Sequence, residues 1–225
     1  MMIEVRSVSK RRGRRVLWQD LTFDVDRGET VALVGPSGAG KSTLLDCIGQ
    51  IDTFDSGSIR INGVVASGRG RSARLVRRDH LGYLFQDFGL MPDLTVQANI
   101  DVARVAGRRR SGMAMRTAAA LERVGLVGRA TDRAHELSGG EQQRVALARL
   151  LVKQPDVVLA DEPTSALDGA NATMVLDLLD EFAESGAAVI MATHSADVEA
   201  RGSRTISLVG SEDSGVGDEP GPLRP

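Results

Sequence analysis

The sequence predicts an α/β fold around a mainly parallel sheet, with an antiparallel β subdomain at the N-terminus and an inserted helical subdomain. Three observations predict this fold. The N-terminal part alternates apolar and polar positions, as half-buried antiparallel strands do. Three continuous apolar runs, at 30–34, 156–160 and 187–192, indicate strands buried on both faces. Helical patterns lie between these runs, and this order is typical of parallel sheets covered by helices.

The N-terminal third holds the expected antiparallel strands. Alternation is clear at 3–6 and 21–25, and a further short strand ending in a turn is expected at 58–63. The apolar run at 30–34 differs, because it has no polar positions facing solvent. Residues 66–79, rich in Gly, Ser and Arg, are expected to form a loop that leads into a basic helix.

The second half of the chain is expected to be helical first and α/β afterwards. From about 93 to 133 the strand signal disappears, and Ala, Leu and Arg at helical spacing predict a helical insertion. The buried strand at 156–160 opens the last third, followed by a helix at about 170–185 and the strand at 187–192. The tail at 211–225 is rich in Gly, Pro and acidic residues and is expected to be disordered.

Length and composition favour one domain. The 225 residues are 42% hydrophobic and 26% charged, as in ordinary globular chains. We expect a single domain over 1–210, with the helical subdomain inserted at about 87–140. The one cysteine, Cys47, excludes an intramolecular disulfide framework and a Cys-rich zinc site, and is interpreted as a small core residue.

Charge and hydropathy restrict the partners. The net charge of −2 argues against nucleic acid binding by bulk charge, so no nucleic acid is expected. No apolar run approaches the length of a membrane-spanning helix, and the first residues lack the apolar core of a signal peptide. A cytoplasmic location is therefore expected. The only lysines are Lys10, Lys41 and Lys153, and nearly all other basic residues are arginines. A lysine in such a chain suggests a position that needs a compact point charge, which arginine cannot supply.

A phosphate-binding loop follows the first buried strand. The pattern G-x-x-x-x-G-K-[ST] is matched by Gly35-Pro36-Ser37-Gly38-Ala39-Gly40-Lys41-Ser42, and a helical pattern runs from 42 to about 50. Glycines let successive N–H groups point at phosphate oxygens, and the helix adds its positive N-terminal end. Lys41 can reach the β- and γ-phosphates, and the Ser42 hydroxyl can bind Mg²⁺. A glycine turn that merely precedes a helix is the less favoured alternative.

A pair of acids ends the second buried strand. Asp161 and Glu162 follow the apolar run at 156–160. Because the carboxyl ends of neighbouring parallel strands meet at the same edge, Asp161 is expected to face the Mg²⁺ near Ser42, and Glu162 to polarise a water. The alternative is a helix N-cap with two solvated acids.

A further motif indicates the protein family that the chain resembles. The segment Leu137-Ser138-Gly139-Gly140-Glu141-Gln142-Gln143-Arg144, together with Val157-Val158-Leu159-Ala160-Asp161-Glu162-Pro163-Thr164, makes the chain resemble the ABC-type ATPases over nearly its whole length. The resemblance implies a P-loop NTPase fold of ABC type, with ATP and Mg²⁺ as ligands. It implies that the Walker A loop binds ATP through Gly35, Pro36, Ser37, Gly38, Ala39, Gly40, Lys41, Ser42 and Thr43.

The resemblance also assigns the hydrolytic residues. Asp161 is the Walker B carboxylate and, with Ser42 and Gln86, binds Mg²⁺. Glu162 is the general base, Gln86 the Q-loop glutamine and His194 the switch histidine that contacts the γ-phosphate. A lone histidine is more often structural, but His194 directly follows a buried strand in the family's order.

The resemblance implies a dimer. Ser138 and Gly140 would bind the γ-phosphate of ATP held by a second copy, and Asp168 belongs to the D-loop. Ser138-Gly139-Gly140 opens a helix expected to begin near Glu141, so its N–H groups form a second anion site. In the family, two copies meet head to tail around two ATP molecules.

Two positions depart from the family pattern. Where the family places an aromatic ring on the adenine, this chain has Arg12, whose guanidinium can stack on a base as well. The alternative is that Arg12 points into solvent and other residues hold the base. The residues before the D-loop Leu-Asp are Ser165-Ala166, where the suspected branch usually has Gly-Asn.

The resemblance implies a separate membrane permease as the second partner, which would place the chain peripherally on the inner face of the cell membrane. The segment 85–96 resembles the groove that grips a permease's cytoplasmic helix, with Phe88, Leu90, Met91 and Leu94 as apolar contacts; ordinary subdomain core is the alternative. The motifs are most similar to the branch that exports lipoproteins, macrolides or peptides, which includes cell-division ATPases. A non-transport ABC ATPase, acting in cell division or on DNA, is the alternative class.

Overall fold

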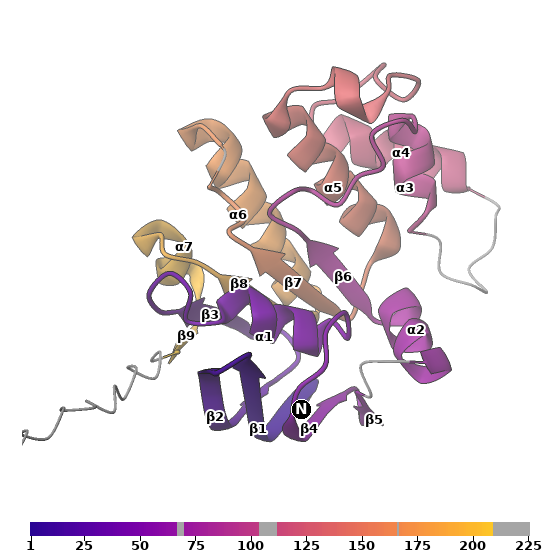
Figure 1. Cartoon of the computed structure of the whole chain (residues 1–225). Helices are drawn as coiled ribbons and strands as arrows, with labels where there is room; N and C mark the ends of the chain where they lie inside the picture. The colour runs from indigo at the N-terminus through magenta and orange to yellow at the C-terminus, as the bar shows by residue number, and fades with distance from the viewer. Residues whose placement is uncertain (67–69, 104–111, 166, 209–225) are drawn as a thin grey trace, which may run out of the picture.

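The protein contains two β-sheets (Figure 1). The structure is a computed structural model, and it describes residues 1–66, 70–103, 112–165 and 167–208. The smaller sheet is antiparallel, in the order β2 (Arg15–Val25), β1 (Ile3–Arg12), β4 (Ser56–Ile61), β5 (Val64–Val65). The larger sheet is parallel, in the order β6 (Leu81–Leu84), β7 (Val157–Asp161), β8 (Ala188–Ala192), β3 (Thr30–Val34), β9 (Arg204–Ser207). The predicted fold class is confirmed. The tail at 211–225 lies outside the described residues.

Helices cover the parallel sheet. The described helices are α1 (Lys41–Ile48), α2 (Gly70–Asp79), α3 (Val96–Asp101), α4 (Met113–Arg123), α5 (Gly139–Lys153), α6 (Gly169–Glu184) and α7 (Ala196–Arg201), with a 3-10 turn at Ala134–Glu136. In Figure 1, α1 lies between the two sheets, and α3, α4, α5 and α6 lie on the other side of the parallel sheet. The basic helix expected near the end of 66–79 is α2.

The alternation of side chains in the central strands divides the core in two. Val157 and Leu159 of β7 face the antiparallel sheet and α1, whereas Val158 and Ala160 face α5 and α6. Every residue of β7 and β8 is buried. Successive side chains of a strand point to opposite faces, so a strand covered on both sides needs apolar residues at all positions.

The antiparallel sheet follows its period of two, apart from register shifts along β1. Ile3, Val5 and Val8 of β1 are fully buried, and polar residues lie between them. The register with β2 shifts between Val5 and Val8, where Ser7 has a φ of 46°. This β-bulge inserts one residue and returns the apolar side chains to the core side.

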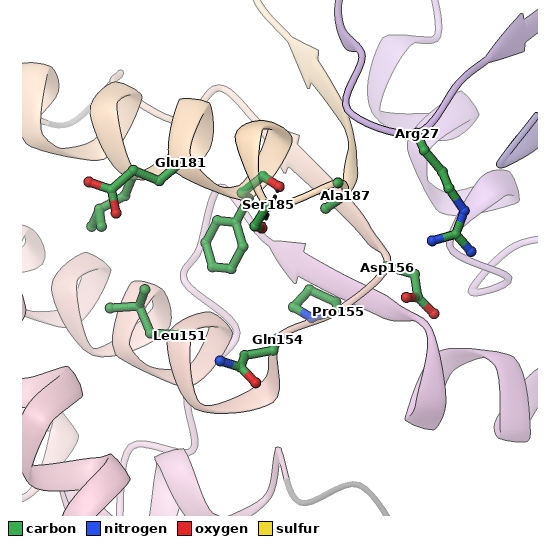
Figure 2. A pocket seen from close by; sticks show the side chains of 11 residues that line it. Arg27, Leu151, Gln154, Pro155, Asp156, Glu181, Ser185 and Ala187 are labelled. Atoms are coloured by element: carbon green, nitrogen blue, oxygen red, sulfur yellow. Dashed lines mark hydrogen bonds between the residues drawn. The ribbon is translucent and has the colours of Figure 1, made fainter.

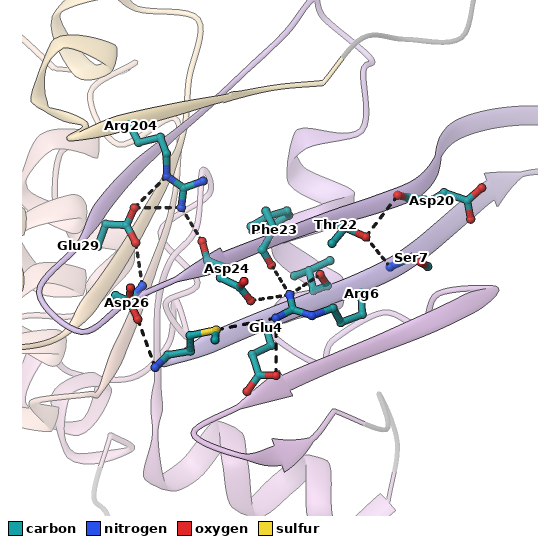
Figure 3. A network of polar contacts seen from close by, with 12 residues as sticks. Glu4, Arg6, Ser7, Asp20, Thr22, Phe23, Asp24, Asp26, Glu29 and Arg204 are labelled. Carbon is teal, nitrogen blue, oxygen red and sulfur yellow. Dashed lines mark hydrogen bonds and ion pairs between the residues drawn. The ribbon is translucent and has the colours of Figure 1, made fainter.

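Polar contacts join the antiparallel sheet to the far edge of the parallel sheet (Figure 3). Arg204 of β9 forms an ion pair with Glu29 at 2.9 Å, and its guanidinium also donates to the Asp24 carbonyl of β2. Glu29 accepts the Asp26 backbone N–H at 2.7 Å. The contacts connect β9 to β2 and to Glu29, which lies just before β3.

The described elements that were not predicted are β5, β6, β9, α7 and the 3-10 turn at Ala134–Glu136. β6 has four residues and β9 is mostly exposed, so neither shows a long apolar run or a clear alternation. Within the described residues, no helix has the length and apolar character needed to cross a membrane.

The buried central strands set the stability of the fold, which leads to a first prediction. Ile190 of β8 is 1% exposed, and Ile190→Ala should lower the free energy of unfolding by about 2–5 kcal/mol, because it leaves a cavity in a layer packed from both sides. Urea unfolding followed by circular dichroism measures the change. Val127→Ala is the matched control, since Val127 is 73% exposed and its truncation should change stability by less than about 0.5 kcal/mol. Equal effects of the two variants would contradict the assigned core.

Candidate functional site

The phosphate-type loop joins β3 to α1. Gly35, Gly38 and Gly40 have φ angles of 151°, 78° and 90°, which L side chains rarely adopt. A Cβ on Gly35 would lie 2.4 Å from the Leu208 carbonyl oxygen. Lys41 is buried, and its Nζ donates to the carbonyls of Gly35 at 2.8 Å and Pro36 at 3.3 Å. The glycines therefore permit a tight loop, and Lys41 is held against it.

The pairing of β3, β8 and β7 aligns the ends of these three strands in the sheet. Leu33 of β3 pairs with Ala192 of β8, and Ala192 pairs with Asp161 of β7. Beyond this row, the Glu162 N–H donates to the Ala192 carbonyl at 2.9 Å, and the Thr193 N–H to the Leu33 carbonyl at 3.1 Å. The loop after β3, the acids of β7 and the residues after β8 thus leave the sheet side by side, at the carboxyl edge where α/β proteins bind ligands.

Glu162 and His194 form a pair at this edge. His194 Nδ1 lies 2.8 Å from Glu162 Oε1. The side chain of Glu162 is 15% exposed, whereas that of His194 is 72% exposed. Glu162 has a φ of 48°, a conformation that costs energy for a residue with a Cβ and that is found at functional sites. A shielded carboxylate is thereby oriented by an accessible imidazole, as a general base requires.

Asp161, the last residue of β7, is buried. Burial raises the pKa of its carboxyl group, and the nearby Glu162 and Asp46 carboxylates raise it further, while Ser42 and Lys41 lower it. Asp161 Oδ1 is buried and has no hydrogen-bond partner. The solvated N-cap that was the alternative interpretation is therefore wrong.

The surroundings of Asp161 fit a Mg²⁺ ion. A buried carboxylate oxygen without a partner, next to a serine hydroxyl and two further carboxylates, is an environment that a hard divalent cation would stabilise. Mg²⁺ commonly binds through one or two carboxylates and the phosphates of a substrate. The described residues contain no cluster of three or more His, Cys, Asp or Glu that could hold a metal ion.

A cavity of about 540 Å³ connects these residues. The residues predicted as site residues that line it are Arg12, Ser37, Gly38, Gly40, Lys41, Ser42, Thr43, Gln86, Glu162 and His194. Gly35, Pro36 and Ala39 belong to the loop without lining the cavity, and the buried Asp161 does not line it either.

Three other predicted residues lie outside this cavity. Ser138, Gly140 and Asp168 do not line it. Ser138 caps the 15-residue helix α5: its hydroxyl and its N–H donate to Glu141 Oε2 at 2.8 and 2.9 Å. These two hydrogen bonds are the largest causes that lower the pKa of Glu141. Helix α5 therefore begins two residues earlier than the predicted start near Glu141.

The start of α5 is connected to the Asp168 loop. Arg144 donates to Asn171 Oδ1 at 2.9 Å, and Asn171 donates through its N–H and its amide group to Asp168 at 3.0 Å. Asp168 is the exposed N-cap of α6, and these contacts lower the pKa of its carboxyl group. Ser138, Gly140 and Asp168 thus belong to a second set of residues, apart from the cavity.

Sequence reasoning missed three residues that line the cavity: Arg15, Leu17 and Ser165. Arg15 pairs with Arg12 across the turn Gly13-Arg14 between β1 and β2. A two-residue hairpin loop containing glycine is a recognisable signal, and it would have placed Arg15 beside Arg12. Arg12 itself is exposed at the cavity wall.

The four apolar residues of the segment 85–96 fall into two groups. Phe88 and Leu90 are partly buried against the helical core, as the alternative interpretation expected. Met91 and Leu94 are 40% and 37% exposed.

A separate cavity of about 400 Å³ lies at the C-terminal ends of α5 and α6, where Gln154, Ser185 and Asp156 line it (Figure 2). None of the predicted site residues lines this cavity.

Comparisons with known proteins agree with the motifs. The profile of the ABC transporter family matches residues 18–165. The lipoprotein-releasing system ATP-binding protein LolD 2 of Rhodospirillum rubrum is 44% identical over 217 residues, covering 92% of this chain and 94% of that protein. The macrolide export ATP-binding/permease protein MacB of Rhodopseudomonas palustris is 43% identical over 195 residues, covering 86% of this chain and 30% of that protein. The chain therefore spans less than a third of MacB's length.

A solved structure shows the same fold. The dimeric, post-hydrolysis structure of the ATP-binding cassette MJ0796, bound to ADP and Pi, has a TM-score of 0.84 with this chain at 31% sequence identity. The match covers 94% of this chain and 97% of that chain.

The tight loop after β3 gives a second prediction. Gly35→Ala should destabilise the protein by about 1–3 kcal/mol and abolish binding of a fluorescent ATP analogue, because the new Cβ would collide with the Leu208 carbonyl in a backbone conformation unsuited to alanine. Thermal unfolding and fluorescence anisotropy measure the two effects. Gly169→Ala is the control, since Gly169 is helical, a Cβ there would meet no atom within 4 Å, and alanine should raise the helix propensity. Retained binding by Gly35→Ala would contradict the assigned loop.

Proposed function

The chain belongs to the ABC transporter family, and we propose that it binds and hydrolyses ATP as the motor subunit of a membrane transport system. The observation that carries this proposal is one cavity that contains the phosphate-type loop, Lys41 and the Glu162–His194 pair. A site for phosphates and a shielded, oriented carboxylate are the two parts that hydrolysis of a phosphoanhydride needs. We further propose that residues 1–210 form one ATPase domain, with a helical subdomain at about 87–140.

In the proposed reaction, Lys41 and the N–H groups of the loop 35–43 bind the β- and γ-phosphates of ATP. Glu162 orients a water and accepts its proton as the water oxygen attacks the γ-phosphorus and the bond to ADP breaks. His194, exposed and 2.8 Å from Glu162, positions this carboxylate and donates to the γ-phosphate. Gln86 lines the same cavity and would contact the attacking water.

Asp161, Ser42 and Gln86 would hold Mg²⁺. When bound, the ion neutralises charge on the phosphate oxygens as the bond to the leaving group breaks. Asp161 contributes a buried oxygen that has no hydrogen-bond partner and is therefore available to the ion.

The site of one chain is incomplete, and we propose that a second copy completes it. Ser138 and Gly140, at the start of α5, would bind the γ-phosphate of ATP held by the partner copy through helix N–H groups. Asp168, which Arg144 and Asn171 connect to α5, would lie at the same interface. The separation of this exposed set from the cavity supports a head-to-tail arrangement, in which two such interfaces close on two ATP molecules.

We propose a membrane permease as the other partner, which would place the protein at the inner face of the cell membrane. The similarity to LolD 2 and to MacB supports an exporter or a system that transmits mechanical work to a partner's extracellular part. The exposed Met91 and Leu94 remain candidate contacts for the permease.

The proposed base gives a third prediction. Glu162→Gln should lower ATP turnover by roughly a hundredfold or more while leaving ATP affinity nearly unchanged, because the amide cannot accept the proton. With ATP and Mg²⁺ it should therefore accumulate as a dimer in size-exclusion chromatography with light scattering. Adding Ser138→Phe should return it to a monomer that still binds ATP. Glu184→Gln, an exposed acid on α6, should behave like wild type. A monomeric Glu162→Gln protein at saturating ATP, with and without membranes, would refute the dimer.

The position of Arg12 gives a fourth prediction. If its guanidinium stacks on the adenine, Arg12→Tyr should tighten ATP binding and increase the preference for ATP over GTP by several-fold, since an aromatic ring stacks without the flexibility of arginine. Titration calorimetry with both nucleotides measures this ratio. An unchanged ratio would show that Arg12 points into solvent and that other residues hold the base.

A further inference from the structure

One polar side chain of α5 is buried next to the loop that carries the proposed base. Gln143 is 4% exposed. Its side-chain amide donates a hydrogen bond to the carbonyl of Pro163, the residue that directly follows Glu162. Neither Gln143 nor Pro163 lines the cavity of about 540 Å³ that would hold ATP. This hydrogen bond therefore connects α5 to the backbone at Glu162 from outside the cavity.

The backbone around Glu162 is held from several sides. The Glu162 N–H donates to the Ala192 carbonyl at 2.9 Å, and the Glu162 carbonyl accepts the N–H and the hydroxyl of Ser165 at 3.2 and 3.1 Å. With a φ of 48°, Glu162 has a conformation that persists only where the surrounding structure holds it. Pro163 has no N–H, so its carbonyl is its single backbone hydrogen-bonding group. Gln143 binds that group and adds a contact from α5 to those from the sheet and from Ser165.

The oxygen of the Gln143 amide has no partner. This Oε1 atom is buried and accepts no hydrogen bond within the described residues. A buried acceptor that stays unpaired lowers stability, and an apolar side chain of similar length would not bear this cost. The hydrogen bond to Pro163 is the contribution that such an apolar side chain could not make. A polar side chain that is unfavourable for packing, beside the loop of a base, fits a role in the reaction.

We propose that Gln143 is a positioning residue for ATP hydrolysis. By holding the Pro163 carbonyl, its amide fixes the backbone from which the Glu162 carboxylate reaches the attacking water. Gln143 does not line the cavity, so it acts through Glu162 and not on ATP itself. The inference rests on the proposed function, which assigns Glu162 as the base.

The first experiment replaces the amide by an apolar side chain of similar length. Gln143→Met should lower kcat for ATP about tenfold to a hundredfold, because a displaced carboxylate orients the attacking water poorly. The KM for ATP should change by less than about twofold, since no group that binds ATP is altered. Gln143→Leu should show the same loss, and ATP binding measured by titration calorimetry shows that each variant is folded. Turnover at the wild-type rate, or a rise in KM that accounts for the lost activity, would overturn the proposal.

A second buried glutamine provides the matched control. Gln50, just after α1, is fully buried, and neither Nε2 nor Oε1 of its side chain has a hydrogen-bond partner. Gln50→Met should leave kcat unchanged and should not lower the melting temperature, because the atoms that it removes make no hydrogen bond. An equal loss of kcat in Gln50→Met and Gln143→Met would assign the effect to packing and contradict the positioning role.

The second experiment tests whether Gln143 acts through Glu162. When Gln143→Met is added to Glu162→Gln, single-turnover hydrolysis should fall by less than about twofold further, because the carboxylate that Gln143 positions is already absent. A larger further loss would show that Gln143 acts on another group, against the proposal. A wild-type protein that does not hydrolyse ATP, with and without membranes, would refute the proposed function itself. Wild-type turnover that Gln143→Met leaves unchanged would refute the positioning role alone.

Discussion

The parallel register of β3, β8 and β7 is the constraint on which the site depends. The row Leu33, Ala192, Asp161 fixes the level at which three segments leave the sheet. A shift of one residue in any of these strands would reverse its side chains between the two cores, so the apolar patterns of both faces hold the register. The phosphate-type loop, Glu162 and His194 are therefore placed by the core, although the chain that connects them is long.

The residues proposed for the site belong to two parts of the chain that lie apart in the fold. One set lies at the carboxyl edge of the sheet, and the other, around Ser138 and Asp168, lies at the N-terminal ends of α5 and α6. Helix α5 contacts both parts of the chain. It begins next to Ser138, and Arg149 near its C-terminal end donates to the carbonyls of Phe88 and Gly89, which closely follow Gln86 in sequence. Phe88 has a φ of 65°, a conformation that these hydrogen bonds help to hold.

Local motifs made much of the fold and of the candidate site predictable from the sequence. The loop 35–42 and the pair Asp161–Glu162 have fixed spacings next to continuous apolar strands, so their positions follow from short segments. The burial of Asp161 and the pairing of His194 with Glu162 could not be predicted, because they depend on contacts between strands distant in sequence. The strand β6 was missed because four residues are too few for a period to be seen. The cavity of about 230 Å³ lined by Arg77, Arg149 and Lys153 was missed because its lining residues come from several segments that are distant in sequence.

The distribution of lysines has a practical consequence for handling the protein. Lys10 and Lys41 are buried, and Lys10 is paired with Asp52 at 2.9 Å, whereas Lys153 is half-buried with its pKa lowered to about 8. Arginine provides the rest of the basic surface and does not react with the usual amine reagents. Dyes or biotin coupled to lysine side chains would therefore be directed to Lys153 and not scattered over every face. A preparation immobilised through that side chain would have a nearly uniform orientation.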